Sequence, residues 1–162
     1  MARLPGLARD PSGAFSVTVG SDSLVVIVGP SHPWARRTDV LGASELFSTP
    51  LVLREPGSGA RTSFDAAVAG HSAARPVAEL PTDAAVMLNT EFGSAPGVVS
   101  RRSAQSAIAD GNLIQVECDV FEHQELSAVW LQPWLLEDAA YRALVDIART
   151  GKAHDSSAFA AR

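Results

Sequence analysis

Short apolar runs alternate with stretches of helical periodicity along nearly the whole chain. The run at residues 24–28, Leu-Val-Val-Ile-Val, is continuous and β-branched, which is typical of a strand buried on both faces, as in parallel sheets. Turn residues bound the other apolar runs, which predict further short strands. These strands are expected at residues 51–53, 77–80, 97–100, 113–116 and 126–131.

Helical patterns fill the intervals between these strands. Helices are expected at residues 43–47, from the turn at 57–59 to near Gly70, from Thr82 or Asp83 through Thr90, at residues 101–110 and at residues 136–149. The last helix is the clearest, because Leu136, Ala140 and Leu144 begin an apolar face with a period of about 3.6 residues. The alternation of strands and helices predicts an α/β fold with a largely parallel sheet flanked by helices.

The composition is that of a folded protein with a sizeable core. The 162 residues are 46% hydrophobic and 19% charged, enough for one domain, or for one domain and a fragment. The formal net charge is −5 and no basic stripe is present, which argues against direct contact with nucleic acid. Residues 1–20 have no apolar signal-peptide core, and no apolar run approaches ~20 residues. A cytoplasmic location without membrane contact is therefore expected.

Cysteine and histidine give no sign of metal or redox chemistry. Cys118 is the single cysteine, which excludes an internal disulfide, and a small buried hydrophobe is its favoured role. The four histidines are scattered without metal-ligand spacing. We therefore expect neither a metal nor a cofactor.

The most informative segment follows the strand at residues 51–53 and reads Glu55-Pro56-Gly57-Ser58-Gly59-Ala60-Arg61. A strand that turns directly into a helix leaves backbone N–H groups without intrahelical partners, and these donors favour an anion. Ser58 is suited to cap the helix, Gly59 lets a ligand approach the backbone, and Arg61 is a forked donor for a carboxylate. The segment matches no P-loop, dinucleotide fingerprint or nucleophile elbow. Two interpretations stay open: a site for a small anion, or an ordinary strand-to-helix turn.

Several motifs occur in a characteristic order along the chain. Residues 22–28 are followed by Pro30-Ser31-His32-Pro33-Trp34-Ala35, by the Gly-Ser-Gly-Ala-Arg turn at residues 57–61, by Ala95-Pro96-Gly97-Val98-Val99-Ser100 and by Ala109-Asp110-Gly111-Asn112-Leu113. In this order and spacing they resemble the effector-binding region of LysR-type transcriptional regulators, over residues 21–148. The His-Pro turn and the Gly-Ser-Gly-Ala-Arg turn are the more specific parts of this resemblance.

The resemblance implies a fold similar to the type 2 periplasmic binding proteins, in which two α/β lobes hold a ligand between them. Residues 21–119 look like the second lobe, and residues 120–150 look like the strand and C-terminal helix that return to the first lobe. Residues 1–20 are expected to be irregular, apart from a short extended piece at residues 15–19, and residues 151–162 to form a flexible tail. The rest of the first lobe and the winged helix-turn-helix of the family have no counterpart in this sequence.

The resemblance also implies a function, which is to bind a small organic anion, with a carboxylate as the leading class, and thereby to modulate transcription. Carried over position by position, the ligand contacts of the family fall on two strand-to-helix turns and one strand end: Ser58, Gly59, Ala60, Arg61, Thr82, Asp83 and Ser100. For Thr82 and Asp83, in the turn after residue 80, plain helix capping is an equally good interpretation.

A partner and an alternative function complete the expectations. Without the sheet of the first lobe, the last strand and helix would expose apolar surface, so a homodimer or a swapped assembly is expected. The alternative is a small enzyme or a solute-binding protein on the same scaffold. An enzyme would use Ser58 or Cys118 as the nucleophile and a histidine as the base. His32 is expected to fix its own turn, and the sensor interpretation, without catalysis, is preferred.

Overall fold

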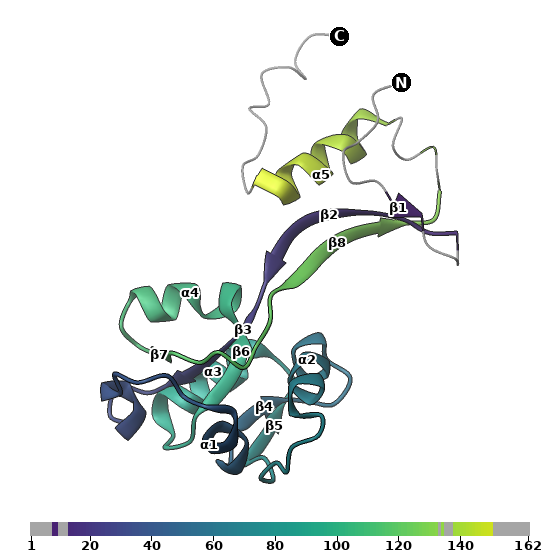
Figure 1. The fold of residues 1–162 in the computed structure, drawn as a ribbon. Helices are drawn as coiled ribbons and strands as arrows, with labels where there is room; N and C mark the ends of the chain where they lie inside the picture. The colour runs from purple at the N-terminus through teal and green to yellow at the C-terminus, as the bar shows by residue number, and fades with distance from the viewer. Residues whose placement is uncertain (1–7, 10–12, 133, 135–137, 151–162) are drawn as a thin grey trace. The chain divides into compact units, whose positions relative to one another are not determined.

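The computed structural model describes residues 8–9, 13–132, 134 and 138–150, which fall into two compact units (Figure 1). We call Asp22–His123 the central unit, and the residues up to Ser21 together with those from Gln124 onward the terminal unit. The chain therefore passes between the units twice. The tail expected at residues 151–162 lies outside the described residues.

The central unit is built on a five-stranded sheet with the order β5-β4-β6-β3-β7. β4 runs parallel to β5 and β6, whereas β3 is antiparallel to both of its neighbours, with Leu24 opposite Ser100 and Val28 opposite Ile114. The strands are β3 (Leu24–Val28), β4 (Val52–Arg54), β5 (Ala78–Leu80), β6 (Gly97–Ser100) and β7 (Ile114–Val116). The sheet is therefore mixed, and the prediction of a largely parallel sheet was wrong. A continuous apolar strand indicates that both of its faces are covered, but it carries no information about the direction of its neighbours.

Helices cover both faces of this sheet and confirm the predicted α/β alternation. Phe47 of α1 and Phe64 of α2 contribute to the core on one face, and Val86 of α3 and Ala104 of α4 contribute to the core on the other. The bounds are η1 (Pro33–Arg36), α1 (Ala43–Ser48), α2 (Gly59–Val68), α3 (Asp83–Phe92) and α4 (Arg101–Ala109).

Strand β3 divides its side chains between these two cores. Val26 and Val28 belong to the core beneath α1 and α2, and Val25 and Ile27 belong to the core beneath α3 and α4. All four side chains are at most 3% exposed. Burying an aliphatic side chain of this size stabilises a fold by about 1.5–3 kcal/mol, so β3 is a main source of the stability of the central unit.

The terminal unit has a three-stranded sheet with the order β1-β2-β8 and one helix among its described residues. Its elements are β1 (Ala8–Arg9), β2 (Phe15–Asp22), β8 (Gln124–Trp130) and α5 (Ala139–Thr150). The short extended piece expected at residues 15–19 lies within β2, which continues to Asp22, and β1 is a further strand inside the segment expected to be irregular. Phe15 stacks on Trp130 with ring centroids 6.3 Å apart, a contact between distant segments that no local pattern reveals.

Helix α5 is amphipathic, but its apolar face is only partly covered. Val145 is buried, whereas Tyr141 and Leu144 are 44% and 60% exposed. Leu136, the first residue of the predicted apolar face, lies outside the described residues. Within the described part of the chain, no helix is long and apolar enough to cross a membrane.

Gly97 provides a test of the packing between β6 and α3. A Cβ atom at this position would overlap Thr90 Oγ1 and lie 3.1 Å from Val86 Cγ1. We expect Gly97→Ala to lower the free energy of unfolding by about 1–3 kcal/mol in urea denaturation, because the core has no room for the added methyl group.

Two further variants make this test specific. Thr90→Ala in the Gly97→Ala background should recover much of the loss, since it removes the overlapping hydroxyl, which has no hydrogen-bond partner among the described residues. Gly42→Ala, where an added Cβ meets nothing within 4 Å, should cost less than about 1 kcal/mol. A Gly97→Ala protein as stable as the wild type would contradict this packing.

Candidate functional site

Three helices of the central unit begin at one edge of its sheet. β4 is parallel to β5 and β6, so the carboxyl ends of these strands share an edge, and α2, α3 and α4 start within a few residues of those ends. We call the three starts, at residues 58–61, 82–83 and 100–103, the cap edge. The first N–H groups of each helix have no intrahelical acceptor, and the positive ends of the helix dipoles lie at the same place. This edge is also where ligands of open α/β sheets bind.

A hydroxyl side chain caps each of these helices. Ser58 Oγ accepts from the Arg61 N–H at 3.1 Å, and Thr82 Oγ1 accepts from the Ala85 N–H at 3.1 Å. Ser100 Oγ accepts from the N–H three residues further along the chain at 3.3 Å. The three hydroxyl residues that were predicted to bind ligand thus share one edge, and each has a structural role as a helix cap.

The turn before α2 presents two backbone donors and a paired cation. Gly59 and Ala60 are the first two helical residues, so their N–H groups have no acceptor within the helix. The Arg61 guanidinium donates to Asp65 at 2.8 Å and to Glu79 at 2.5 Å. These bonds, the Glu79 bond first, raise the pKa of Arg61, which stays fully charged but already has carboxylate partners.

Arg54, at the end of β4, was not identified from the sequence. Its Nη1 atom lies 2.7 Å from Asp83 Oδ1, and Ser103 Oγ donates to Asp83 Oδ2 at 2.6 Å. Asp83, the first residue of α3, therefore connects β4, α3 and α4. The single hint in the sequence is a basic residue at the end of a strand, which does not reveal a partner 29 positions away.

Ser100 is likewise engaged, because its hydroxyl donates to the Asp22 carboxylate. Asp22 also accepts from the backbone N–H of Ser23 at 2.8 Å and from that of Arg102 at 3.4 Å. The cap edge therefore contains both cationic and anionic groups, arranged in pairs.

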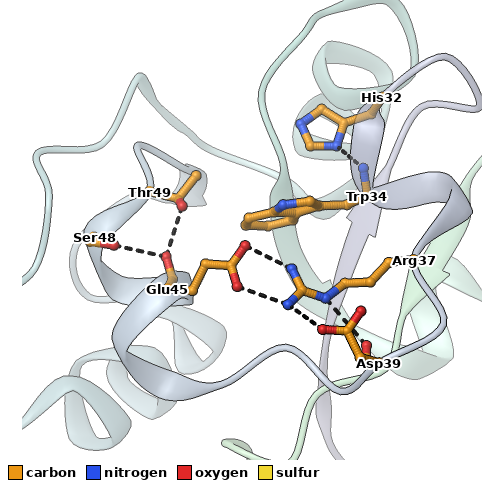
Figure 2. Close-up of polar contacts among 7 residues, drawn as sticks. All are labelled: His32, Trp34, Arg37, Asp39, Glu45, Ser48 and Thr49. Atoms are coloured by element: carbon orange, nitrogen blue, oxygen red, sulfur yellow. Dashed lines mark hydrogen bonds and ion pairs between the residues drawn. The ribbon is translucent and has the colours of Figure 1, made fainter.

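The His-Pro turn lies at the opposite edge of the sheet, since it follows the carboxyl end of β3, which is antiparallel to β6. His32 Nδ1 accepts from the Trp34 N–H at 3.1 Å, and burial lowers the pKa of His32, which favours the neutral ring that can accept this bond. The prediction that His32 fixes its own turn is confirmed. Figure 2 shows the Arg37 guanidinium bound by both carboxylate oxygens of Glu45, at 2.7 and 2.8 Å, and by Asp39.

Among the described residues, the two candidate nucleophiles, Ser58 and Cys118, are not paired with a base. Cys118 is half-buried, and burial raises the pKa of its thiol, which keeps it protonated near neutral pH. In the part of the chain that the structure describes, no histidine hydrogen-bonds to Ser58 or Cys118. The same part holds no group of three or more His, Cys, Asp or Glu side chains placed to bind a metal ion.

The chain is similar to a family of regulators along most of its length. Residues 2–153 match the family model described as the LysR substrate binding domain. Uncharacterized HTH-type transcriptional regulators of Mycobacterium bovis and Mycobacterium tuberculosis are 41% identical to it over 127 residues, which cover 75% of this chain and 41% of each relative. The chain thus spans less than half the length of the curated relatives it matches.

Solved structures with the same fold are also regulators. The regulatory domain of CcmR from Synechocystis, in complex with 2-PG, matches with a TM-score of 0.72 and 21% identity over 90% of this chain and 71% of that one. The regulatory domain of MetR from N. meningitidis matches with a TM-score of 0.68 and 14% identity, over 89% and 66% of the two chains. Full-length LysG from Corynebacterium glutamicum, with bound effector Arg, gives 0.64 and 18%, over 89% and 49%. Because these identities are all 21% or lower, the similarity establishes a shared fold only.

Cys118 provides a test of the enzyme alternative. Because burial raises the pKa of the thiol, we expect the folded protein at pH 7.5 to react with iodoacetamide at least about tenfold more slowly than the protein unfolded in urea. Mass spectrometry of timed samples measures both rates. Equal rates would indicate an accessible thiolate and would restore Cys118 as a candidate nucleophile.

Proposed function

The chain belongs to the family of LysR substrate-binding domains, and from this premise we propose that it binds a small organic anion as the effector-binding part of a LysR-type transcriptional regulator. The observation that carries the proposal is the convergence of three helix N-termini on one sheet edge. Members of this family are regulators, and the curated relatives are transcriptional regulators rather than enzymes.

The donors at the cap edge favour a carboxylate or a similar anion. The N–H groups of Gly59 and Ala60 point along the start of α2, where the helix dipole attracts negative charge. The Ser58 hydroxyl lies beside them and can donate to a ligand while it accepts from its own helix. Arg61 lies in the same turn and would exchange one of its carboxylate partners for the ligand. The CcmR regulatory domain is known with 2-PG, and we propose that this chain also takes a small, charged ligand.

The other candidate residues frame this position. Thr82 and Ser100 hold the starts of α3 and α4, and their hydroxyls are the groups a ligand would meet along the edge. Asp83 is itself negatively charged and would repel an anionic ligand. Its role in the site therefore depends on Arg54, the cation with which it pairs. We propose that residues 21–119 correspond to the second lobe of the periplasmic-binding-protein-like fold and residues 120–150 to elements of the first.

A homo-oligomer is the second part of the proposal, and the terminal unit supports it. β8 ends the strand order β1-β2-β8, so it pairs with one strand in the described sheet, and an open edge invites another strand. Val129 and Leu131 are 62% and 72% exposed there. A groove of about 310 Å³ between β8 and α5 is lined by Ala128, Val129, Trp130, Tyr141, Leu144, Val145 and Ala148. Apolar surface of this kind promotes association with a second copy.

Backbone amide signals test the anion site directly. Sodium malonate added to ¹⁵N-labelled protein should shift the Gly59 and Ala60 signals saturably, because their N–H groups would donate to the carboxylate. Ser58→Ala should weaken malonate binding about three- to tenfold, the scale of one hydrogen bond.

The start of α1 is the matched control for this experiment. It begins after Gly42 without a side-chain cap, so general attraction of anions to helix ends would shift the Ala43 and Ser44 signals as well. Sodium chloride at the same ionic strength controls for screening. The proposal fails if malonate, succinate and phosphate all leave the signals of the cap edge unchanged.

Leu144 and Leu88 form a matched pair for testing self-association. The two side chains are 60% and 59% exposed, one on α5 in the terminal unit and the other on α3 in the central unit. In sedimentation velocity, Leu144→Lys should raise the Kd of self-association about tenfold and so favour the monomer, because the substitution places a charge in the apolar groove. Leu88→Lys should leave the distribution unchanged. A wild-type protein that is monomeric at every concentration would contradict the proposal.

A further inference from the structure

Arg54 and Asp83 form an unusual ion pair at the cap edge. Their side chains are 20% and 17% exposed, so both partners are largely shielded from solvent. In each of the other ion pairs among the described residues, the carboxylate is at least 42% exposed. Solvent and salt therefore screen this pair less than the others, and its charges matter more to any ion that approaches the edge.

The Asp83 carboxylate makes the contacts that an anionic ligand would seek at this place. It is the first residue of α3, and it accepts from Arg54 on β4 and from Ser103 in the first turn of α4. A single carboxylate thus engages a cation and two helix starts. The protein itself supplies an anion at the cap edge.

The pairing uses Arg54 incompletely. Only Nη1 bonds to Asp83, and the Nε–H of Arg54 is buried without an acceptor among the described residues. A guanidinium binds a carboxylate best through two parallel hydrogen bonds. Asp83 is held by its own helix and by Ser103, whereas a free carboxylate can align with the parallel donors at Nη1 and Nη2 of Arg54.

We propose that Asp83 competes with the ligand for Arg54, so that binding exchanges the Arg54–Asp83 pair for a pair between Arg54 and the anionic group of the ligand. This inference rests on the proposed anion site and adds a cation to it that the sequence did not indicate. It also defines the ligand class, because a neutral molecule of the same shape cannot displace a carboxylate from a guanidinium. The exchange of partners releases Asp83 from Arg54 on β4. Any link between β4 and the start of α3 then depends on the ligand, because the Arg54–Asp83 ion pair no longer connects them.

The test is the affinity of malonate for Asp83→Asn, measured by isothermal titration at constant ionic strength. Asparagine keeps the size of the side chain and an oxygen for Ser103 but removes the competing charge. Malonate should bind the variant about tenfold more tightly than the wild type, the scale of one charge–charge interaction at a few ångström. Malonamide, which is neutral, should bind neither protein. Arg54→Gln should abolish malonate binding.

Glu45→Gln is the matched control. It removes one of the two carboxylate partners of Arg37 at the opposite edge of the sheet, so it costs an ion pair without touching the cap edge. Its affinity for malonate should equal that of the wild type. Ser103→Ala is a milder variant of the same idea, since it loosens Asp83 without changing the charge, and it should tighten malonate binding about two- to threefold.

The outcomes separate this inference from the proposed function. If the wild type binds malonate and Asp83→Asn binds it equally or more weakly, competition is refuted while the anion site stands. If Asp83→Asn does not fold, Ser103→Ala decides by the same criterion. If malonate, succinate and phosphate bind neither the wild type nor the Asp83 variant, and all three leave the Gly59 and Ala60 signals unchanged, both proposals fail.

Discussion

The burial of β3 on both faces is the constraint on which the central unit depends. Four consecutive apolar side chains can leave water only if helices cover the sheet on both sides, and α1 and α2 do so on one side and α3 and α4 on the other. β6, which pairs with β3 through four residue pairs, divides its own Val98 and Val99 between the same two cores. β7 pairs with the other edge of β3, and β4 and β5 are joined to this centre through β6.

The cap edge is a consequence of that arrangement. Parallel strands need return connections, and here the connections that follow β4, β5 and β6 are helices that start at one edge of the sheet. The edge therefore gathers positive helix ends, but it also holds carboxylates on Arg54, Arg61 and Ser100. A ligand at this edge would exchange partners with groups that are already paired. The free energy of that exchange, rather than the number of donors, would set its affinity.

In the terminal unit, the apolar faces of the helix and of the sheet are only partly buried. α5 has an apolar face, but only Val145 reaches burial among its described side chains, and β8 leaves Val129 in solvent. An amphipathic element is stable only when something packs against its apolar face. In this unit a three-stranded sheet buries part of the apolar face of α5, and the proposed second copy would bury the remaining apolar surface.

The sequence by itself determined the local features of this protein. The unbroken apolar run of β3 indicated that both of its faces are buried. Ser58 and Thr82 indicated where helices start, because a capping side chain binds an N–H group only three residues away. Only the tertiary structure decided which segments meet: the antiparallel direction of β3, the Arg54–Asp83 pair across 29 positions, and the stacking of Phe15 on Trp130. A residue pattern records whether a side chain is buried or capped. It does not record which distant segment provides the contact, because that is settled by how the whole chain packs.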